Sequence, residues 1–406
     1  MHKELLWMSI SIPYDKVDHA GGKTHNFYIK KVHAVQQFHV KLISFCEKKD
    51  LGKSDLDKYG LDADICYLDQ NSWSTFVKKV YNSVSILNPF TKYANVISNY
   101  RVHECLKRIK YLNKTGYRPD IVILQWTSLG ILQQKIRKYF PNAKFIVIEE
   151  DVTFQNYERR YLLERFIIQK IFYKIRFQNL KKKELHSLNM ADLVFVNNKK
   201  DYNLLIENNI EKSKIKVLVP YYDQYFHVNR SANTPYKDLL FYGAMSRREN
   251  YLSAIWFIQN VFSKIEDSTV RFIIVGSRPH KSLKKFESER IIITGFVKDV
   301  STYFEKSTCM VVPLLYGAGI KVKVLEGFSS GIPILTNHIG IEGIGGCSGK
   351  EYYHCESAQE YINAIEQIIN NRKTAQQIGE NGRKFVKEQF DYYNYSNTMT
   401  DILKEM

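Results

Sequence analysis

The sequence lacks any apolar run of the roughly 18 to 20 residues that a membrane-spanning helix needs. Near its start, the stretch from Leu5 to Ile12 is interrupted by two serines and followed by Pro13, which is typical of a first strand and not of a signal peptide. The six cysteines form no Cys-x-x-Cys pair and have no metal-ligand spacing. We therefore expect buried free thiols in a reducing, cytoplasmic protein.

Acidic residues are scarce relative to basic ones, with 42 Asp and Glu against 59 Lys and Arg and a net charge of +17. This excess indicates attraction to an anionic partner: nucleic acid, an acidic membrane surface or a phosphorylated small molecule. A generally lysine-rich composition explains it equally well. No recognisable nucleic-acid-binding module is present, which argues against the first partner.

Repeats and low-complexity tracts are also absent, and the 406 residues suit two domains. Strand-like apolar runs alternate with helical patterns in both halves, which predicts parallel βα units. The runs expected as strands are Val40–Phe45, Ile121–Leu124, Phe145–Ile148, Leu193–Val196, Leu239–Tyr242, Arg271–Val275, Ile291–Thr294, Cys309–Pro313 and Pro333–Thr336. A non-periodic stretch of Pro, Asn, Ser and Thr predicts a boundary near residue 225.

The most informative segment, 313–336, reads as strand, Gly-rich turn, helix and strand. Gly317 and Gly319 allow a ligand close to the backbone at a helix N-terminus, where free N–H groups favour phosphate. Lys321 and Lys323 add positive charge, and Glu326 one turn later suits two vicinal hydroxyls. Two lysines and a glutamate on one helix are equally compatible with a solvated face.

The motif Gly317-Ala-Gly-Ile-Lys-Val-Lys-Val-Leu-Glu326, followed by Gly-Ile-Pro, resembles the retaining GT-B glycosyltransferases of family 4, the group 1 glycosyl transferases. The resemblance runs through most of the C-terminal half, in the stretches 240–250, 274–276, 293–299 and 339–344. It implies two Rossmann-like α/β domains facing an interdomain cleft: residues 1–224 for the acceptor, residues 225–385 for the nucleotide-sugar donor, and a final segment 386–406 that crosses back.

The resemblance also implies roles for individual residues of the C-terminal half. The donor would contact Gly243, Gly317, Gly319 and Ile320 through the backbone, and Phe296 and Val297 would present backbone groups to the base. Arg247, Arg248, Lys321 and Lys323 are the candidates for the diphosphate, with Lys323 also stabilising the leaving group, and Glu326 would hold the ribose. For the two arginines, an exposed helix start is an equal alternative.

In the N-terminal half the resemblance is weaker. Ala20 to His25, with Gly22, is expected as a glycine loop that approaches the donor diphosphate, and it lacks P-loop spacing. Glu150 and Asp151 follow a strand, where a carboxylate orients or deprotonates an acceptor hydroxyl. Capping of the next helix is the alternative for both acids.

Two departures from common family patterns affect the predicted chemistry. Ala318 stands where many members have a first glutamate, which leaves the donor sugar undefined. Asp62 and Asp64 read as the start of a strand and not as a metal-holding pair. We expect no cofactor, no metal and retention of configuration.

Two basic, aromatic segments, Tyr157–Lys183 and Lys78–Arg108, suit either an anionic membrane surface or core-packed helices with one solvated face. The predicted function is transfer of a sugar from a nucleotide-diphosphate sugar to a glycan or lipid-linked acceptor in surface polysaccharide synthesis, in the cytoplasm or peripherally on its membrane face. A sugar-nucleotide epimerase and a basic nucleic-acid-binding protein remain alternatives.

Overall fold

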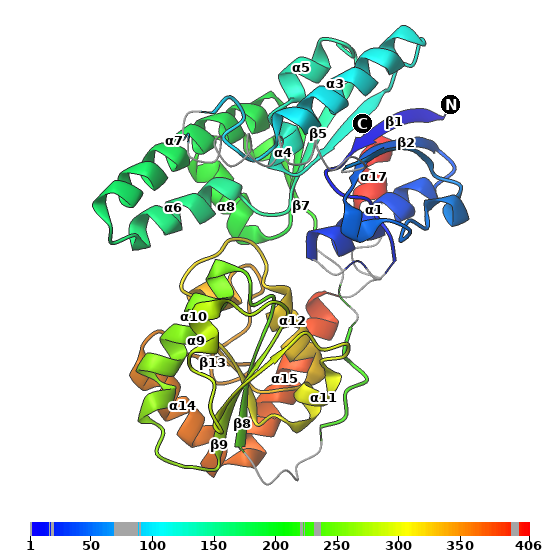
Figure 1. Ribbon diagram of the computed structural model, residues 1–406. Helices are drawn as coiled ribbons and strands as arrows, with labels where there is room; N and C mark the ends of the chain where they lie inside the picture. Colours follow the sequence, from blue (N-terminus) through cyan, green and yellow to red (C-terminus); the bar gives the residue numbers. More distant parts are fainter. Residues whose placement is uncertain are drawn as a thin grey trace. The chain divides into compact units, whose positions relative to one another are not determined.

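A computed structural model describes residues 2–15, 17, 20–68, 88, 91–219, 222, 224–230, 237–390 and 398–406. The chain divides into two compact units (Figure 1): unit 1 comprises Met1–Pro220 and Tyr395–Met406, and unit 2 comprises Tyr221–Asn394. The division falls a few residues before the boundary expected near 225. The chain returns to unit 1 at Tyr395, later than the expected residue 386, because a long helix of unit 2 continues to Gln389.

Unit 1 is a parallel sheet with helices on both faces. Its described strands follow the order β3-β2-β1-β4-β5-β6-β7, and every neighbouring pair is parallel. The elements are β1 (Lys3–Met8), α1 (Ala20–His33), β2 (Phe38–Cys46), β3 (Asp62–Tyr67), α3 (Asn99–Lys114), β4 (Ile121–Gln125), α4 (Thr127–Gly130), α5 (Gln133–Arg137), β5 (Lys144–Glu149), α6 (Thr153–Leu163), α7 (Ile167–Met190), β6 (Leu193–Val196), α8 (Lys199–Glu207), β7 (Ile215–Val217) and α17 (Thr398–Glu405).

Alternating side chains of the central strands fill two cores, one on each face of this sheet. On β1, Leu5 and Trp7 belong to one apolar cluster, whereas Leu6 and Met8 belong to the other, as the two-residue period of a strand requires. The helix α17 packs against α1 (Figure 1), and its fully buried Leu403 lies in the first of these clusters. The last helix is therefore part of the core of unit 1.

Unit 2 repeats the parallel plan with the strand order β10-β9-β8-β11-β12-β13. The elements are β8 (Lys237–Tyr242), α9 (Arg248–Asn260), β9 (Val270–Val275), α10 (Lys281–Lys284), β10 (Ile291–Gly295), α11 (Ser301–Lys306), β11 (Cys309–Val312), α12 (Val322–Ser330), β12 (Ile334–Thr336), α13 (His338–Ile341), β13 (Tyr353–His354), α14 (Ala358–Asn370) and α15 (Arg372–Gln389). Aromatic rings join α9 to the sheet, since the centroids of Phe257 and Phe272 lie 4.8 Å apart. Both units thus place strand C-termini at one edge of a parallel sheet, where ligands of such folds bind.

Each strand expected from the sequence is present within a few residues, β3 begins at Asp62 as expected, and the described strands also include β7 and β13. The predicted glycine loop at residues 20–25 is wrong, because these residues form the start of α1. Within the predicted basic segment Lys78–Arg108, residues 78–87 and 89–90 lie outside the described residues, as do residues 391–397 near the end of the chain. In the described parts of the chain, no helix is both long and apolar enough to cross a membrane.

Candidate functional site

Three glycines lie side by side where the neighbouring strands β8, β9 and β10 end. The amide of Gly243 donates to Val275, and that of Gly276 donates to Gly295 at 2.9 Å. A Cβ on Gly276 would come within 1.7 Å of the Gly243 carbonyl oxygen, and the positive φ of 156° disfavours any other residue there as well. The backbone at Gly276 is consequently packed too tightly for a side chain, whereas the space beside Gly295 is open.

Lys323, in the first turn of α12, reaches this glycine edge. A Cβ on Gly243 would lie 2.8 Å from the Lys323 Nζ atom. Lys323 Nζ donates to the Asn250 Oδ1 atom at 2.6 Å, while the Asn250 amide nitrogen donates to the carbonyl of Ala244 at 2.9 Å. Burial, together with Arg247 and Lys321, lowers the pKa of Lys323 to about 7. An anion bound beside this amine would favour its charged form.

The Gly-rich turn before α12 holds the second predicted lysine differently. Lys321 Nζ donates to the carbonyl of Gly319 at 2.5 Å, and its Cε atom lies 3.1 Å from where a Cβ on Gly317 would stand. The same Nζ lies 3.7 Å from the carboxylate of Glu342, and both side chains are largely buried. Lys321 therefore braces the turn and is partly neutralised by Glu342.

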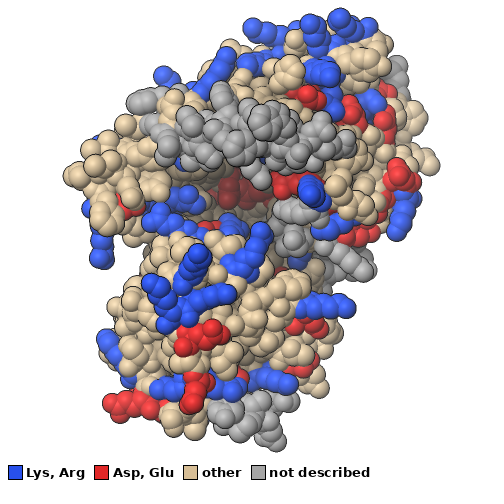
Figure 2. Space-filling view, viewed as in Figure 1, with Lys and Arg blue, Asp and Glu red and all other residues tan. Residues whose placement is uncertain are grey.

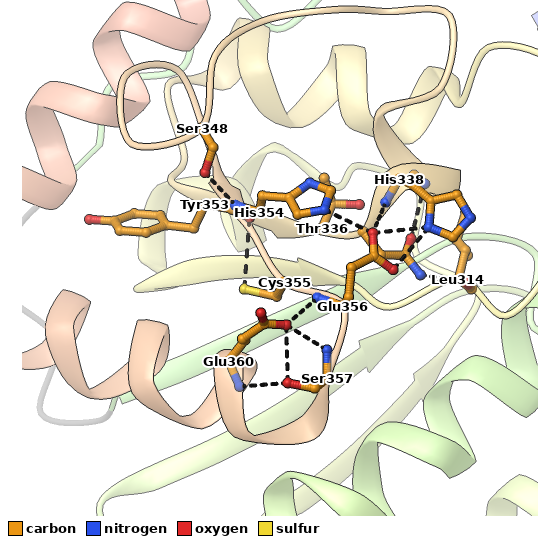
Figure 3. Close-up of polar contacts among 12 residues, drawn as sticks. Leu314, Thr336, His338, Ser348, Tyr353, His354, Cys355, Glu356, Ser357 and Glu360 are labelled. Atoms are coloured by element: carbon orange, nitrogen blue, oxygen red, sulfur yellow. Dashed lines mark hydrogen bonds and ion pairs between the residues drawn. The ribbon is translucent and has the colours of Figure 1, made fainter.

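The other end of the turn is fixed by residues after β12 (Figure 3). The side-chain amide of Asn337 donates to the carbonyl of Leu314 at 2.7 Å. Beside it, Glu356 accepts bonds from the His338 ring and backbone N–H and pairs with His354 at 2.8 Å. The bond from Asn337 therefore ties the residues after β12 to the start of the Gly-rich turn, and the contacts of Glu356 hold together the segment that crosses from β12 to α14.

The remaining predicted residues of unit 2 are spread along the strand ends. Glu326 is only 5% exposed, and its charge, after burial, helps raise the pKa of Tyr225 to about 12. Arg247 precedes α9 and pairs with Glu249, and Arg248 is the first residue of that helix; both arginines are exposed. Ile320 is half-buried in the turn. Figure 2 shows Lys and Arg gathered on unit 2 over the region of α9 and α10.

Phe296 and Val297 follow β10, which is the edge strand and is separated from β8 by β9. Phe296 is 76% exposed. The structure thus brings Gly243 and Lys323 together and leaves these two residues on a neighbouring part of the same sheet edge. Asn250, which bonds Lys323 from 73 positions away in the chain, had no signal in the sequence because its role depends on this tertiary contact.

Glu150 of unit 1 lies at the end of β5 among uncharged hydrogen-bond donors. Its two carboxyl oxygens accept from the side-chain amides of Gln125 at 2.6 Å and Asn197 at 2.7 Å. Burial raises the pKa of Glu150 to about 8, against the opposing effect of these two hydrogen bonds. Such a carboxyl group can carry or accept a proton near neutral pH. Neither amide partner was identified from the sequence.

The start of α1 lies against this carboxyl group. A Cβ on Gly21 would lie 3.3 Å from the Glu150 Cγ atom and 3.1 Å from the Trp126 indole nitrogen. The close approach is therefore at Gly21, next to the predicted Gly22. The His25 ring packs between two indoles, 5.8 Å from Trp7 and 5.5 Å from Trp126. Aromatic and polar side chains thus surround Glu150.

Two further carboxyl groups are buried behind it. The Thr127 hydroxyl lies 2.5 Å from a Glu149 oxygen and 3.2 Å from a Glu184 oxygen. Glu184, on α7, also accepts from the backbone N–H groups of Thr153 and Phe154 and so caps α6. Burial raises the pKa of both acids, that of Glu184 to about 8. Asp151 is half-buried and accepts a long 3.4 Å bond from the Thr153 hydroxyl.

Among the described side chains, no group of three or more His, Cys, Asp or Glu is arranged to hold a metal ion. Asp62 opens β3 as expected and pairs with Lys41, and Asp64 pairs with Arg108. Independence from metal remains a prediction.

Comparison with known proteins supports the resemblance of the motifs. The family model of glycosyl transferases group 1 matches residues 236–371, which cover the glycine edge, Asn250, the Gly-rich turn and α12. All of the matched residues lie within unit 2. The predicted family resemblance is thereby confirmed.

Two curated relatives align with parts of the chain. A 44.6 kDa protein in the cps region of Klebsiella pneumoniae is 21% identical over 38% of the chain and 42% of its own length. A 41.2 kDa protein in the cps region of the same organism is 24% identical over 52% of the chain and 66% of its length. The chain thus spans about half the length of the curated relatives it matches.

Solved structures resemble the chain over its whole length. Sucrose-phosphate synthase from Thermosynechococcus elongatus has a TM-score of 0.70 at 14% identity, covering 100% of this chain and 99% of that one. HepE from Anabaena, solved in complex with UDP-glucose, has a TM-score of 0.65 at 11% identity with full coverage of both chains. The predicted GT-B fold, with two Rossmann-like domains, is confirmed.

Proposed function

We propose that the protein transfers a sugar from a nucleoside-diphosphate sugar to a hydroxyl group of a glycan or lipid-linked acceptor. The observation that carries this proposal is the meeting of Lys323, Asn250 and the side-chain-free glycine edge at the carboxyl ends of β8 and β9. The resemblance to HepE with UDP-glucose makes uridine diphosphate the first donor nucleotide to test.

In the proposed donor site, Lys323 and the N-terminus of α12 contact the diphosphate, and Glu326 on the same face of the helix holds the ribose. Arg247 and Arg248 add positive charge from the start of α9, and backbone groups of Phe296 and Val297 take the base. Positive charge next to the diphosphate stabilises the leaving group as the glycosidic bond breaks. Lys321 acts mainly by shaping the turn that contains Gly317, Gly319 and Ile320.

On the acceptor side we assign Glu150 the role of orienting and deprotonating the acceptor hydroxyl, with Asp151 as a secondary candidate. The pKa of about 8 suits proton transfer near neutral pH. Gly21 allows the start of α1 to lie beside this carboxyl group, next to the predicted Gly22. Retention of the anomeric configuration and catalysis without a metal belong to the same proposal.

Synthesis of a surface polysaccharide is the proposed setting, because the two curated relatives are proteins in a cps region. The acceptor would accordingly be a growing saccharide, and the sugar would be transferred at the cytoplasmic side of the cell envelope.

A thermal-shift series with nucleoside diphosphates tests the donor assignment, because a ligand that binds only the folded state raises the melting temperature. Uridine diphosphate should stabilise the wild type, and Lys323→Ala should reduce that shift. Glu150→Gln should keep the shift and lose transfer from the nucleotide sugar. Transfer should persist in excess chelator. Equal binding by Lys323→Ala and wild type would contradict the donor site, and activity restored only by magnesium or manganese would contradict metal independence.

A further inference from the structure

The tip of the helical hairpin formed by α6 and α7 exposes a concentration of large apolar side chains. Of the eleven large hydrophobic residues that are exposed in the described chain, six lie between positions 162 and 171: Leu162, Leu163, Phe166, Ile167, Ile168 and Ile171. Ile168 is 80% exposed and Phe166 is 71% exposed. Apolar side chains gathered in this way on a protein surface mark an interaction site.

Contacts along the hairpin hold α6 and α7 together from the base to the tip. At its base, Glu184 on α7 accepts from two backbone N–H groups at the start of α6. Midway, the rings of Phe154 and Phe177 pack with their centroids 6.4 Å apart. At the tip, the Glu164 carboxylate accepts from the backbone N–H groups of Arg165 and Phe166. Figure 1 shows the two helices running side by side from the sheet to this turn.

The charge around the tip is strongly positive. Residues 157–183 contain nine Lys and Arg against two Glu, and one of the two acids, Glu164, is occupied at the turn. Arg165 and Lys174 are exposed beside the apolar side chains. In Figure 2 the corresponding end of unit 1 is largely uncharged surface with Lys and Arg at its margins. An apolar tip bordered by cations matches the layered chemistry of an anionic bilayer surface.

We propose that the α6–α7 tip inserts its apolar side chains into the interfacial region of an anionic lipid bilayer, with the neighbouring lysines and arginines at the headgroups. A second copy of this chain is the less suitable occupant, because docking two such tips would bring like charges together. The inserted element is the turn and the first residues of α7. Only a part equivalent to about three helical turns of the basic segment 157–183 therefore enters the bilayer. This proposal does not depend on which sugar is transferred.

Flotation of the full chain with phosphatidylcholine vesicles, with and without phosphatidylglycerol, tests the insertion. We expect binding to the anionic vesicles and weak binding to the neutral ones. The variant Phe166→Ser, Ile167→Ser, Ile168→Ser should bind anionic vesicles at least about tenfold more weakly, since three inserted side chains are lost. The variant Leu51→Ser, Tyr67→Ser, Tyr111→Ser removes three other exposed apolar side chains of unit 1 and should bind like the wild type.

A reporter at the tip separates insertion from other effects. The emission of Phe166→Trp should shift to the blue when anionic vesicles are added, as an indole leaves water. Wild-type binding by the tip serine variant, no binding by the wild type to either vesicle, or no blue shift would each overturn the proposal. A dimer of the wild type that the tip variant loses in sedimentation without lipid would assign the tip to a second copy instead.

Discussion

Lys323 is the residue in which local environment and proposed role are most directly linked. It lies beside the glycine edge and donates a hydrogen bond to Asn250. Its amine lies over the Phe241 ring, 4.9 Å from the ring centroid. These contacts orient the amine, while burial and like charges hold its pKa near 7. The Lys323 amine is therefore only partly protonated near pH 7, and a bound anion would favour its fully protonated, cationic form.

The first prediction is that binding of uridine diphosphate takes up a proton near pH 7. Because the pKa of Lys323 in the free protein is about 7 and an anion raises it, affinity should fall by up to about tenfold per pH unit above pH 7. Calorimetry in buffers of different ionisation enthalpy measures the uptake. Lys323→Gln should abolish it, whereas Lys284→Gln, on an exposed position of α10, should not. The same uptake in Lys323→Gln would exclude this lysine as the source.

The second prediction separates ribose from phosphate recognition. Glu326→Gln should weaken both uridine and uridine diphosphate by roughly ten- to a hundredfold, about 1–3 kcal/mol, because charge-assisted hydrogen bonds to the hydroxyls become neutral. Lys323→Ala should weaken the diphosphate and spare the nucleoside. Glu366→Gln, exposed on α14, serves as the matched control for a lost carboxylate. Unchanged affinity of Glu326→Gln for both ligands would refute the ribose assignment.

At the scale of elements, the helix α7 connects the buried acids near Glu150 with the exposed apolar tip of the hairpin. Its Glu184 caps α6 and lies against Thr127 and Glu149 beneath the strand end that carries Glu150. Its other end forms the exposed apolar tip. Ionisation of the buried acids is therefore expected to weaken the contacts that hold both the hairpin and the strand end in place.

The third prediction concerns these buried acids and pH. Because burial raises the folded-state pKa of Glu149 and Glu184 above that of the unfolded chain, their contribution to stability is complete at low pH. It declines above about pH 4.5, by on the order of 1 kcal/mol per pH unit for each group, and the part contributed by Glu184 is lost once the pH passes about 8. Thermal unfolding between pH 5 and 9 should show this decline, reduced in Glu149→Gln. Glu211→Gln, exposed elsewhere in unit 1, should leave the slope unchanged, and an equal slope in Glu149→Gln would disprove the explanation.

The elements show which parts of the structure the sequence can predict. Long apolar runs such as Phe145–Ile148 and Leu193–Val196 identify central strands because both faces of these strands are buried. The two-residue strand β13 carries too little apolar signal to be predicted. For the edge strand β3, whose Asp62 and Asp64 are charged, the sequence indicates only the start. The turn between α6 and α7 has no Gly or Pro to reveal it.

The site follows the same division. The glycines, Lys323 and Glu326 were identified because a local motif contains them, and their contacts at the sheet edge follow from strand–turn–helix geometry. Asn250, Gln125 and Asn197 were missed because each acts through a partner far away in the chain. Residues 20–25 were expected as a loop because of their glycines, but they pack as a helix against Trp126 and Glu150, where only a small residue fits.

At the scale of the whole molecule, the chain leaves unit 1 at Pro220 and re-enters it at Tyr395. Met399 and Leu403 of α17 are fully buried in unit 1. In addition, Lys3 of β1 donates through its Nζ atom to the carbonyls of Leu403 and Lys404. The first strand and the last helix are thus joined directly.

The fourth prediction is that truncating this helix's core side chains destabilises unit 1 selectively. Met399→Ala or Leu403→Ala should each cost about 2–5 kcal/mol, because each leaves a cavity in a packed core. Hydrogen exchange should accelerate in α1 and remain unchanged in α14 of unit 2. Asp401→Ala, on the exposed side of α17, should affect neither. Equal acceleration in both units would show that the two units unfold together.

The return of α17 also orders events during synthesis on the ribosome. Unit 2 is a single continuous stretch, Tyr221–Asn394, whereas unit 1 needs residues from both sides of it. The face of β1 that carries Leu5 and Trp7 consequently cannot pack against Met399 and Leu403 until unit 2 has been translated. A nascent chain can therefore complete unit 2 while unit 1, which is made first, is still unfinished, and this reverses the usual N-to-C order of domain folding.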